Sequence, residues 1–158
     1  MNENIKARSD DRHRAANKLF LACPFCQLER LLERNLGEGY FLSVPAGILD
    51  LEEQGFQEQL EYLLLQEGIT DIYLVFEPSC SIIEDAAAHH HPNSAQVHSI
   101  RDLLAEAREP IAAGLKVLRD QMERLIARPI LQAHVNSNTL RIHRVITYKH
   151  EESVLEVM

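Results

Sequence analysis

The feature that most constrains the fold is a continuous apolar run, Ile72-Tyr73-Leu74-Val75-Phe76. A strand that is apolar at every position buries both faces, as the strands of parallel sheets do when helices cover them on either side. Shorter apolar runs precede it at 19–22 and 40–44, and leucines at helical spacing follow each of them. This alternation predicts an α/β fold with three layers, in which helices flank a central, mostly parallel sheet.

The remaining segments complete this pattern. Helices are expected at about 28–36 and 51–67, and the third strand at 69–76. Residues 81–93 are expected to be irregular, and a long helical region covers about 100–126, where Pro110 must either kink the helix or start a second one. Strands at 140–148 and 154–157 then form a C-terminal hairpin. We expect residues 1–158 to fold as a single domain, with residues 1–17 as an N-terminal arm or tail.

Composition and charge exclude several classes of function. The formal net charge of −8 argues against binding to nucleic acid or to anionic membranes. No apolar run reaches the roughly 18 residues of a membrane span, and the polar first 14 residues do not resemble a signal peptide. The chain has 3 cysteines, an odd number that disfavours a disulfide framework. The expected location is therefore the reducing cytoplasm, where the thiols are available for metals or redox chemistry.

All three cysteines follow predicted strands, Cys23 and Cys26 after the first and Cys80 after the third. In parallel sheets, binding sites lie beyond the carboxyl ends of the strands. Thiolates are good ligands for zinc, which usually takes four ligands, and Glu77 stands three residues before Cys80. The predicted zinc ligands are Cys23, Glu77 and Cys80, with Cys26 available as a fourth. The alternative is that the cysteines are buried as small hydrophobic residues.

Two further motifs have functional interpretations. Cys23-Pro24-Phe25-Cys26 resembles the CxxC site of thioredoxin-like proteins, in which the thiol pKa is lowered at a helix start, although the following strand order fits that fold poorly. The tract His89-His90-His91 is either a metal-binding segment or a solvated loop. His134, His143 and His150 are expected to be surface or sheet residues.

The order of motifs resembles the β-class carbonic anhydrases from about Leu19 to Met158. The first matching segment is Cys23-Pro24-Phe25-Cys26-Gln27, where the family has Cys-x-Asp-x-Arg. The segment 44–48 matches the family's Arg-Asn-Ala-Gly-Asn, and 76–81 matches its Gly-His-x-x-Cys-Gly. The segments 140–144 and 151–157 match its final Ile-His-Gly strand and hairpin.

The resemblance implies a zinc-dependent lyase that hydrates carbon dioxide, with zinc held by two cysteines and one histidine. The two cysteine positions match Cys23 and Cys80, while the histidine position holds Glu77. The family's Asp and Arg, which orient the zinc-bound water, are replaced by Phe25 and Gln27. A carboxylate in place of histidine adds negative charge that opposes ionisation of the water. Because Phe25 cannot accept a hydrogen bond and Gln27 carries no charge, we expect a degenerate active site.

Three hypotheses follow. In the first, the protein resembles β-carbonic anhydrases, binds zinc through Cys23 and Cys80, and hydrates carbon dioxide weakly or not at all. In the second, it is an active zinc lyase that uses Cys23, Glu77 and Cys80. In the third, it is a CxxC thiol–disulfide redox protein. The resemblance also implies a homodimer or a higher oligomer, and bicarbonate as a candidate small-molecule partner.

Overall fold

The computed structural model describes residues 17–83 and 110–158. Within these ranges one sheet has the strand order β2-β1-β3-β4-β5. Its strands are β1 (Lys18–Ala22), β2 (Tyr40–Ser43), β3 (Asp71–Phe76), β4 (Arg141–Tyr148) and β5 (Ser153–Val157). The first four run parallel, and β5 returns antiparallel to β4. The expected mostly parallel sheet and C-terminal hairpin are confirmed, with strand ends that differ from the predictions by one or two residues.

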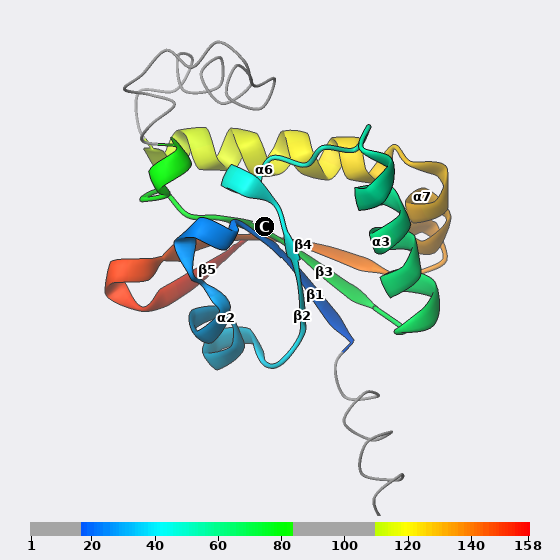
Figure 1. Cartoon of the computed structure of the whole chain (residues 1–158), viewed down its shortest axis with the longest axis horizontal. Coiled ribbons are helices and arrows are strands. Elements are labelled where there is room, and N and C mark those ends of the chain that lie inside the picture. The colour runs from blue at the N-terminus through cyan, green and yellow to red at the C-terminus, as the bar shows by residue number, and fades with distance from the viewer. Residues whose placement is uncertain (1–16, 84–109) are drawn as a thin grey trace, which may run out of the picture.

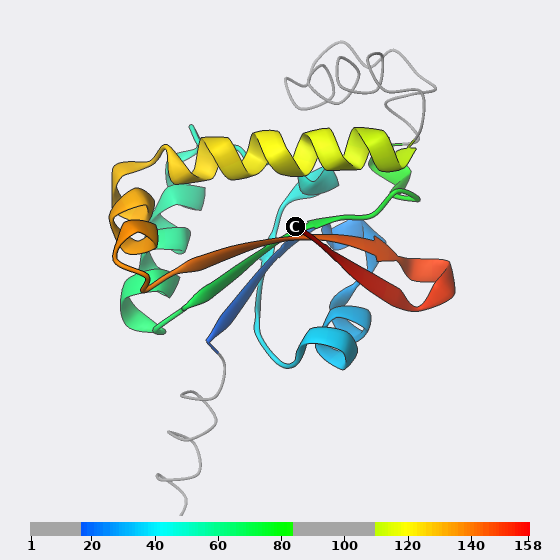
Figure 2. The same cartoon turned by 180° about the vertical axis from the view of Figure 1, so that it is seen from behind.

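Helices cover both faces of the sheet, which confirms the three-layer α/β architecture. The main helices are α2 (Glu29–Leu36), α3 (Gln54–Gln66), α6 (Pro110–Ile126) and α7 (Pro129–Asn136). In Figures 1 and 2, α6, α3 and α7 lie on one side of the sheet and α2 lies on the other. Three short 3-10 turns join the elements: η1 (Pro24–Cys26), η2 (Pro45–Gly47) and η3 (Lys149–Glu151).

The hydrophobic core lies around the neighbouring strands β1 and β3. Every residue of β3 is buried, as its continuous apolar run predicts. On α3 the buried stripe consists of Phe56, Leu60 and Leu64. The core also takes in polar side chains, among them Gln121 of α6, whose amide oxygen accepts a hydrogen bond of 2.7 Å from the backbone N–H of Leu49. This bond satisfies a loop donor that would otherwise be costly to bury.

Some elements differ from the sequence prediction. Helix α7 was not predicted; Pro129 at its first turn is the signal for it, because proline suits that position. Residues 81–83 are helical where irregular chain was expected. The rest of 81–93 with His89-His90-His91, the segment 100–109 and most of the N-terminal arm lie outside the described residues. No helix among the described residues is long and apolar enough to cross a membrane.

Candidate metal centre

The three cysteines meet at one edge of the sheet. Cys23 comes directly after β1, and Cys26 ends the η1 turn that follows. Cys80 comes four residues after β3, which pairs in parallel with β1. Because neighbouring parallel strands bring their carboxyl ends to the same edge, residues from distant parts of the chain converge here. The fold thus brings the three cysteines to one edge of the sheet.

Their sulfur atoms form a compact, buried group. All three lie within 4.8 Å of one another, and the Sγ atoms of Cys23 and Cys80 are 3.7 Å apart. The exposed fractions of Cys23, Cys26 and Cys80 are 6%, 4% and 2%. None of them forms a disulfide. We refer to Cys23, Cys26 and Cys80 as the thiol cluster.

A tight loop from η2 approaches the thiol cluster. Ala46, with φ of 58°, adopts a left-handed conformation that is unusual for a residue with a side chain. Gly47 follows with φ of 74°, and a Cβ atom there would lie 2.9 Å from the backbone oxygen of Val75. Only glycine fits this close contact with β3. The turn holds the backbone of Ala46 within hydrogen-bonding reach of Cys23.

Hydrogen bonds within the thiol cluster give its members different protonation states. Bonds from the Cys26 and Cys80 thiols lower the pKa of Cys23 well below its usual range, and backbone bonds from Ala46 and Phe25 act in the same direction. The pKa of Cys26 is raised, first by its hydrogen bond to Cys23. The pKa of Cys80 is also raised, chiefly by its own bond to Cys23. Cys23 is therefore the thiolate of the cluster, and the other two thiols donate to it.

Glu77 follows β3 and is buried, with an exposed fraction of 5%. Its Oε2 accepts hydrogen bonds of 2.9 Å from both the N–H and the hydroxyl of Ser79. Its Oε1 accepts bonds from the Thr147 hydroxyl at 3.1 Å and from the Lys149 N–H at 2.8 Å. Four donors compensate the cost of burying this carboxylate. Through them Glu77 ties the end of β3 to the turn between β4 and β5.

Comparison with known proteins gives a match at the level of structure alone. No protein-family model matches the sequence, and no curated protein matches it. Among solved structures, the chain is similar to the β-carbonic anhydrase CafD of Aspergillus fumigatus, with 14% identity and a TM-score of 0.72 over 90% of both chains. The chain has the β-carbonic anhydrase fold.

Two other solved structures show the same similarity. A β-carbonic anhydrase of Coccomyxa has 16% identity and a TM-score of 0.69, covering 98% of this chain and 81% of that one. A tetrameric β-carbonic anhydrase of Sordaria macrospora has 14% identity and a TM-score of 0.71, covering 98% and 90%. The fold predicted from the order of the motifs is therefore confirmed at identities that leave the activity open.

Within this β-carbonic anhydrase fold, the site residues predicted from sequence divide into two sets. Cys23, Cys26 and Cys80 form the one group among the described residues whose ligand atoms are arranged to hold a metal ion, and Glu77 is not part of that group. Glu77 reaches instead toward Ser79 and the β4–β5 turn. Sequence reasoning did not identify Thr147 and Lys149 as its partners, since they lie about 70 residues further along the chain.

Phe25 and Gln27, the residues expected to replace an Asp and an Arg, do not contribute polar groups to the thiol cluster. Phe25 is 65% exposed, and Gln27 is exposed in a left-handed conformation with φ of 53°. Neither side chain therefore adds a charged group beside the thiol cluster.

Proposed function

We propose that this chain is a zinc-binding protein with the β-carbonic anhydrase fold, in which the thiol cluster holds the ion. The proposal is carried by the spacing of the sulfur atoms. Tetrahedral zinc with Zn–S bonds of about 2.3 Å requires sulfurs separated by roughly 3.8 Å. Cys23 and Cys80 are separated by 3.7 Å, and Cys26 lies within 4.8 Å of both. The donors therefore need little rearrangement to bind the ion.

The surroundings of the cluster also suit thiolates. Backbone hydrogen bonds reach Cys23 from Ala46 and Phe25, and Cys80 from Ile83. Such bonds stabilise the negative charge on sulfur that metal binding requires. A reducing compartment such as the cytoplasm would keep these thiols free, which agrees with the location expected from the cysteine count.

Cys26 is the preferred third ligand in this proposal, and Glu77 is the alternative. To reach the ion, the Glu77 carboxylate would have to give up bonds from Ser79, Thr147 and Lys149. Leaving the buried Thr147 hydroxyl unpaired alone costs about 1–3 kcal/mol, and the part-buried donors of Ser79 and Lys149 add to this cost. Cys26 already lies among the other sulfurs and would give up only its proton and its hydrogen bond to Cys23.

We expect this centre to hydrate carbon dioxide weakly or not at all. When bound with an open position, zinc supplies a Lewis acid that generates hydroxide near neutral pH. Three thiolates around the ion leave a net negative charge, which opposes this ionisation. Neither Phe25 nor Gln27 reproduces the charged pair that the resemblance implies for that position. The competing hypothesis is an active lyase that uses Cys23, Glu77 and Cys80.

Metal analysis of purified, untagged protein tests the zinc site. The wild type should contain about one zinc per chain, and Cys26→Ser and Cys80→Ser should each lose most of it. Glu77→Gln should keep its zinc. Glu61→Gln, an exposed change of the same kind as Glu77→Gln but on α3, is the matched control. Zinc retained by Cys26→Ser but lost from Glu77→Gln would replace our ligand set with the alternative one. A wild type without metal, carrying a reversible Cys23–Cys26 disulfide, would favour the redox hypothesis.

A stopped-flow assay tests the expectation that the centre hydrates carbon dioxide weakly or not at all. Zinc-loaded wild type should raise the rate of carbon dioxide hydration little above that of buffer. A large rate that disappears in Cys23→Ser would establish an active lyase instead.

We also propose that the chain forms a homodimer or a higher oligomer. Strands β2 and β5 are the outer strands of the described sheet, and Leu155 on β5 is 51% exposed. The similar Sordaria macrospora protein is tetrameric. Light scattering coupled to gel filtration should give a mass of at least twice 18.0 kDa.

Bicarbonate remains the candidate small molecule for the site at the thiol cluster.

A further inference from the structure

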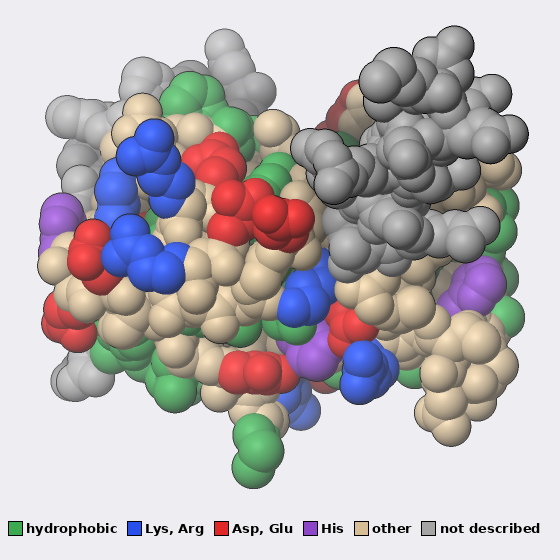
Figure 3. Space-filling model, turned by 90° about the horizontal axis from the view of Figure 1, so that it is seen from below, with side chains coloured by type: hydrophobic (Ala, Val, Ile, Leu, Met, Phe, Trp, Pro, Cys, Tyr) green, Lys and Arg blue, Asp and Glu red, His purple; other side chains and the backbone are tan. Residues whose placement is uncertain are grey.

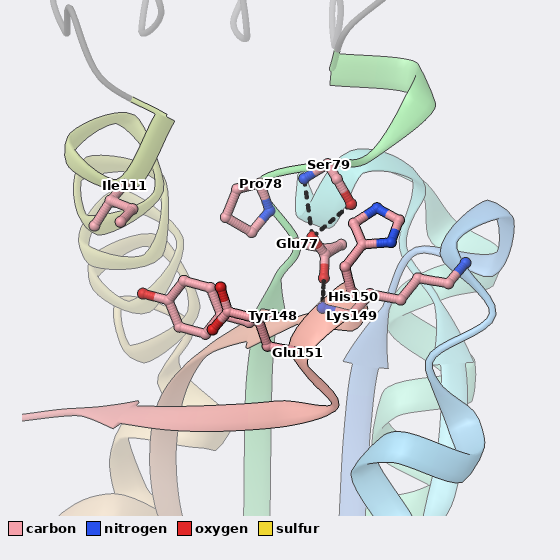
Figure 4. Close-up of a pocket in the computed structure, with 8 residues that line it drawn as sticks. All are labelled: Glu77, Pro78, Ser79, Ile111, Tyr148, Lys149, His150 and Glu151. Carbon is pink, nitrogen blue, oxygen red and sulfur yellow. Dashed lines mark hydrogen bonds between the residues drawn. The ribbon is translucent and has the colours of Figure 1, made fainter.

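The thiol cluster offers three sulfur donors and no fourth ligand from the described chain. Among residues 17–83 and 110–158, the group of side chains that could hold an ion has these three members alone. Glu77 does not complete it, because both of its carboxylate oxygens already accept hydrogen bonds. Figure 4 shows this carboxylate held between Ser79 and the backbone N–H of Lys149. An occupant that needs exactly three ligands therefore suits the cluster as it stands.

Trivalent arsenic is such an occupant. It takes three ligands in a pyramid and carries a lone pair on the remaining side, whereas zinc usually takes four ligands. Bonds from arsenic to sulfur are close in length to zinc–sulfur bonds, which are about 2.3 Å. The 3.7 Å between the Sγ atoms of Cys23 and Cys80 therefore suits arsenic as well, and Cys26 lies within 4.8 Å of both.

The burial of the cluster also favours a trivalent centre. Cys23, Cys26 and Cys80 are all almost completely removed from solvent. Three thiolates around zinc leave a net negative charge, whereas three thiolates around trivalent arsenic leave a neutral product. Because a buried charge has a large desolvation cost, the neutral product is the better match for these surroundings.

The thiol cluster borders a cavity through Cys26. This residue forms part of the wall of a cavity of about 160 Å³, and Ser79 and Ser81 also line it. At neutral pH, trivalent arsenic is present in water as arsenous acid, As(OH)₃, an uncharged molecule of four heavy atoms that fits this volume. Since it carries no charge, it needs no charged partner, and the basic residues Lys149 and His150 of the wall take no part in binding it.

We propose that the thiol cluster is a binding site for trivalent arsenic, held by three sulfur atoms. Each thiol proton leaves with one hydroxyl of arsenous acid, so three arsenic–sulfur bonds form, three arsenic–oxygen bonds break and three water molecules are released. Arsenic stays trivalent, so the step needs no oxidant or reductant. This inference rests on the three-cysteine ligand set of the zinc proposal, but it does not require zinc to be bound.

Titration of arsenous acid into the full chain, reduced with a phosphine and freed of metal, tests the proposal. Arsenic–sulfur bonds absorb in the ultraviolet, so the absorbance gives both affinity and stoichiometry. Native mass spectrometry counts the bonds, because two bonds leave one hydroxyl on arsenic and three bonds leave none. We expect one arsenic per chain, with no hydroxyl retained.

Single-sulfur variants test whether all three thiols take part. Cys26→Ser and Cys80→Ser should each bind at least about 100-fold more weakly, because the third sulfur acts at a high effective concentration. Ser81→Ala is the matched control; it alters the cavity wall, removes no sulfur and should bind as the wild type does. Circular dichroism checks that each variant is folded. Cys26 lies in the η1 turn outside the sheet, so Cys26→Ser decides the result if Cys80→Ser does not fold.

Equal affinity of Cys26→Ser and wild type would overturn the proposal, as would a wild-type product that keeps a hydroxyl on arsenic. The zinc proposal fails separately. A chain that contains zinc as purified but forms fewer than three arsenic–sulfur bonds would refute only this inference. A chain that forms all three bonds but contains no zinc as purified would support this inference and refute the zinc proposal.

Discussion

At the scale of single residues, the three thiols differ in what they contribute. Cys23 has a strongly lowered pKa because the thiols of Cys26 and Cys80 donate hydrogen bonds to it. The pKa values of the two donors are raised by the same bonds. Before any metal arrives, the cluster therefore holds one negative charge and two protons near neutral pH.

This distribution predicts the number of protons that zinc displaces. Binding to three thiolates must remove the protons of Cys26 and Cys80, so about two protons should leave per zinc, and affinity should rise with pH. Calorimetry in buffers of different ionisation enthalpy measures this number. Release of about three protons would show that Cys23 is also a thiol before binding, and release of about one would indicate that only two of the sulfurs bind as thiolates.

At the scale of elements, the contact of α6 with the sheet depends on one glycine. A Cβ atom at Gly114 would lie 2.6 Å from the ring of Phe76, the last residue of β3. Phe76 is 3% exposed and is held within the core, so the ring has little room to move. The absence of a side chain at Gly114 allows α6 to lie directly against the end of the strand that leads to Glu77 and Cys80.

Gly114→Ala should therefore destabilise the fold. Alanine favours a helix over glycine by up to about 1 kcal/mol, but overpacking a core costs about 1–3 kcal/mol. We expect a net loss of about 1–2 kcal/mol in the free energy of unfolding, measured by urea denaturation. Gly55→Ala in α3 is the control, because its Cβ would meet only the flexible side-chain end of Glu53. The control should be neutral or slightly stabilising; equal losses in both variants would contradict this account.

The sequence could predict most of the elements and some of the contacts between them. The apolar runs located the strands, and Cys23 and Cys80 each follow one of them. Because parallel strands bring their carboxyl ends to the same edge of a sheet, the meeting of these two cysteines could be predicted. The direction of Glu77 could not, because its hydrogen-bond partners Thr147 and Lys149 become neighbours only when β4 pairs with β3. Helix α7 was missed since eight residues carry too little periodicity to stand out.

At the scale of the whole molecule, a polar network crosses three strands on the far side from α6. Asp71 of β3 is 4% exposed and bonds to Arg141 and His143 of β4, and His143 also contacts Glu156 of β5 at 2.6 Å. Seen from below, basic, acidic and histidine side chains lie together on this face (Figure 3). The imidazole of His143 also stacks on Tyr73, with ring centroids 4.4 Å apart. The network joins the C-terminal hairpin to the centre of the sheet.

Asp71→Asn should weaken this network in a pH-dependent way. Burial alone would raise the pKa of Asp71, but bonds from His143, Thr70 and Arg141 outweigh it, so the pKa is lowered. The carboxylate therefore stabilises the fold above the ordinary aspartate pKa of about 3.9, and that contribution is lost as the pH falls through the native value. At pH 7 the variant should lose about 2 kcal/mol, and the difference from wild type should shrink below pH 4.

Glu156→Gln supplies the comparison for that experiment. Glu156 is half-exposed at the outer end of the network, and an exposed pair contributes at most about 1 kcal/mol. Its effect at pH 7 should therefore be smaller than that of Asp71→Asn. A pH-independent loss in Asp71→Asn would mean that packing at this position, rather than its charge, stabilises the sheet.

The division of the thiol cluster into a local pair and a distant third has a consequence for the order of folding. Cys23 and Cys26 share one turn, but Cys80 lies 57 residues from Cys23 and reaches it only after β3 has paired with β1. In the proposed zinc-bound protein, an ion first held by the local pair would gain its full binding energy only when the sheet closes. It would then connect the loops that follow β1 and β3. Because these contacts would form only after the two strands have paired, they would slow unfolding far more than they would speed folding.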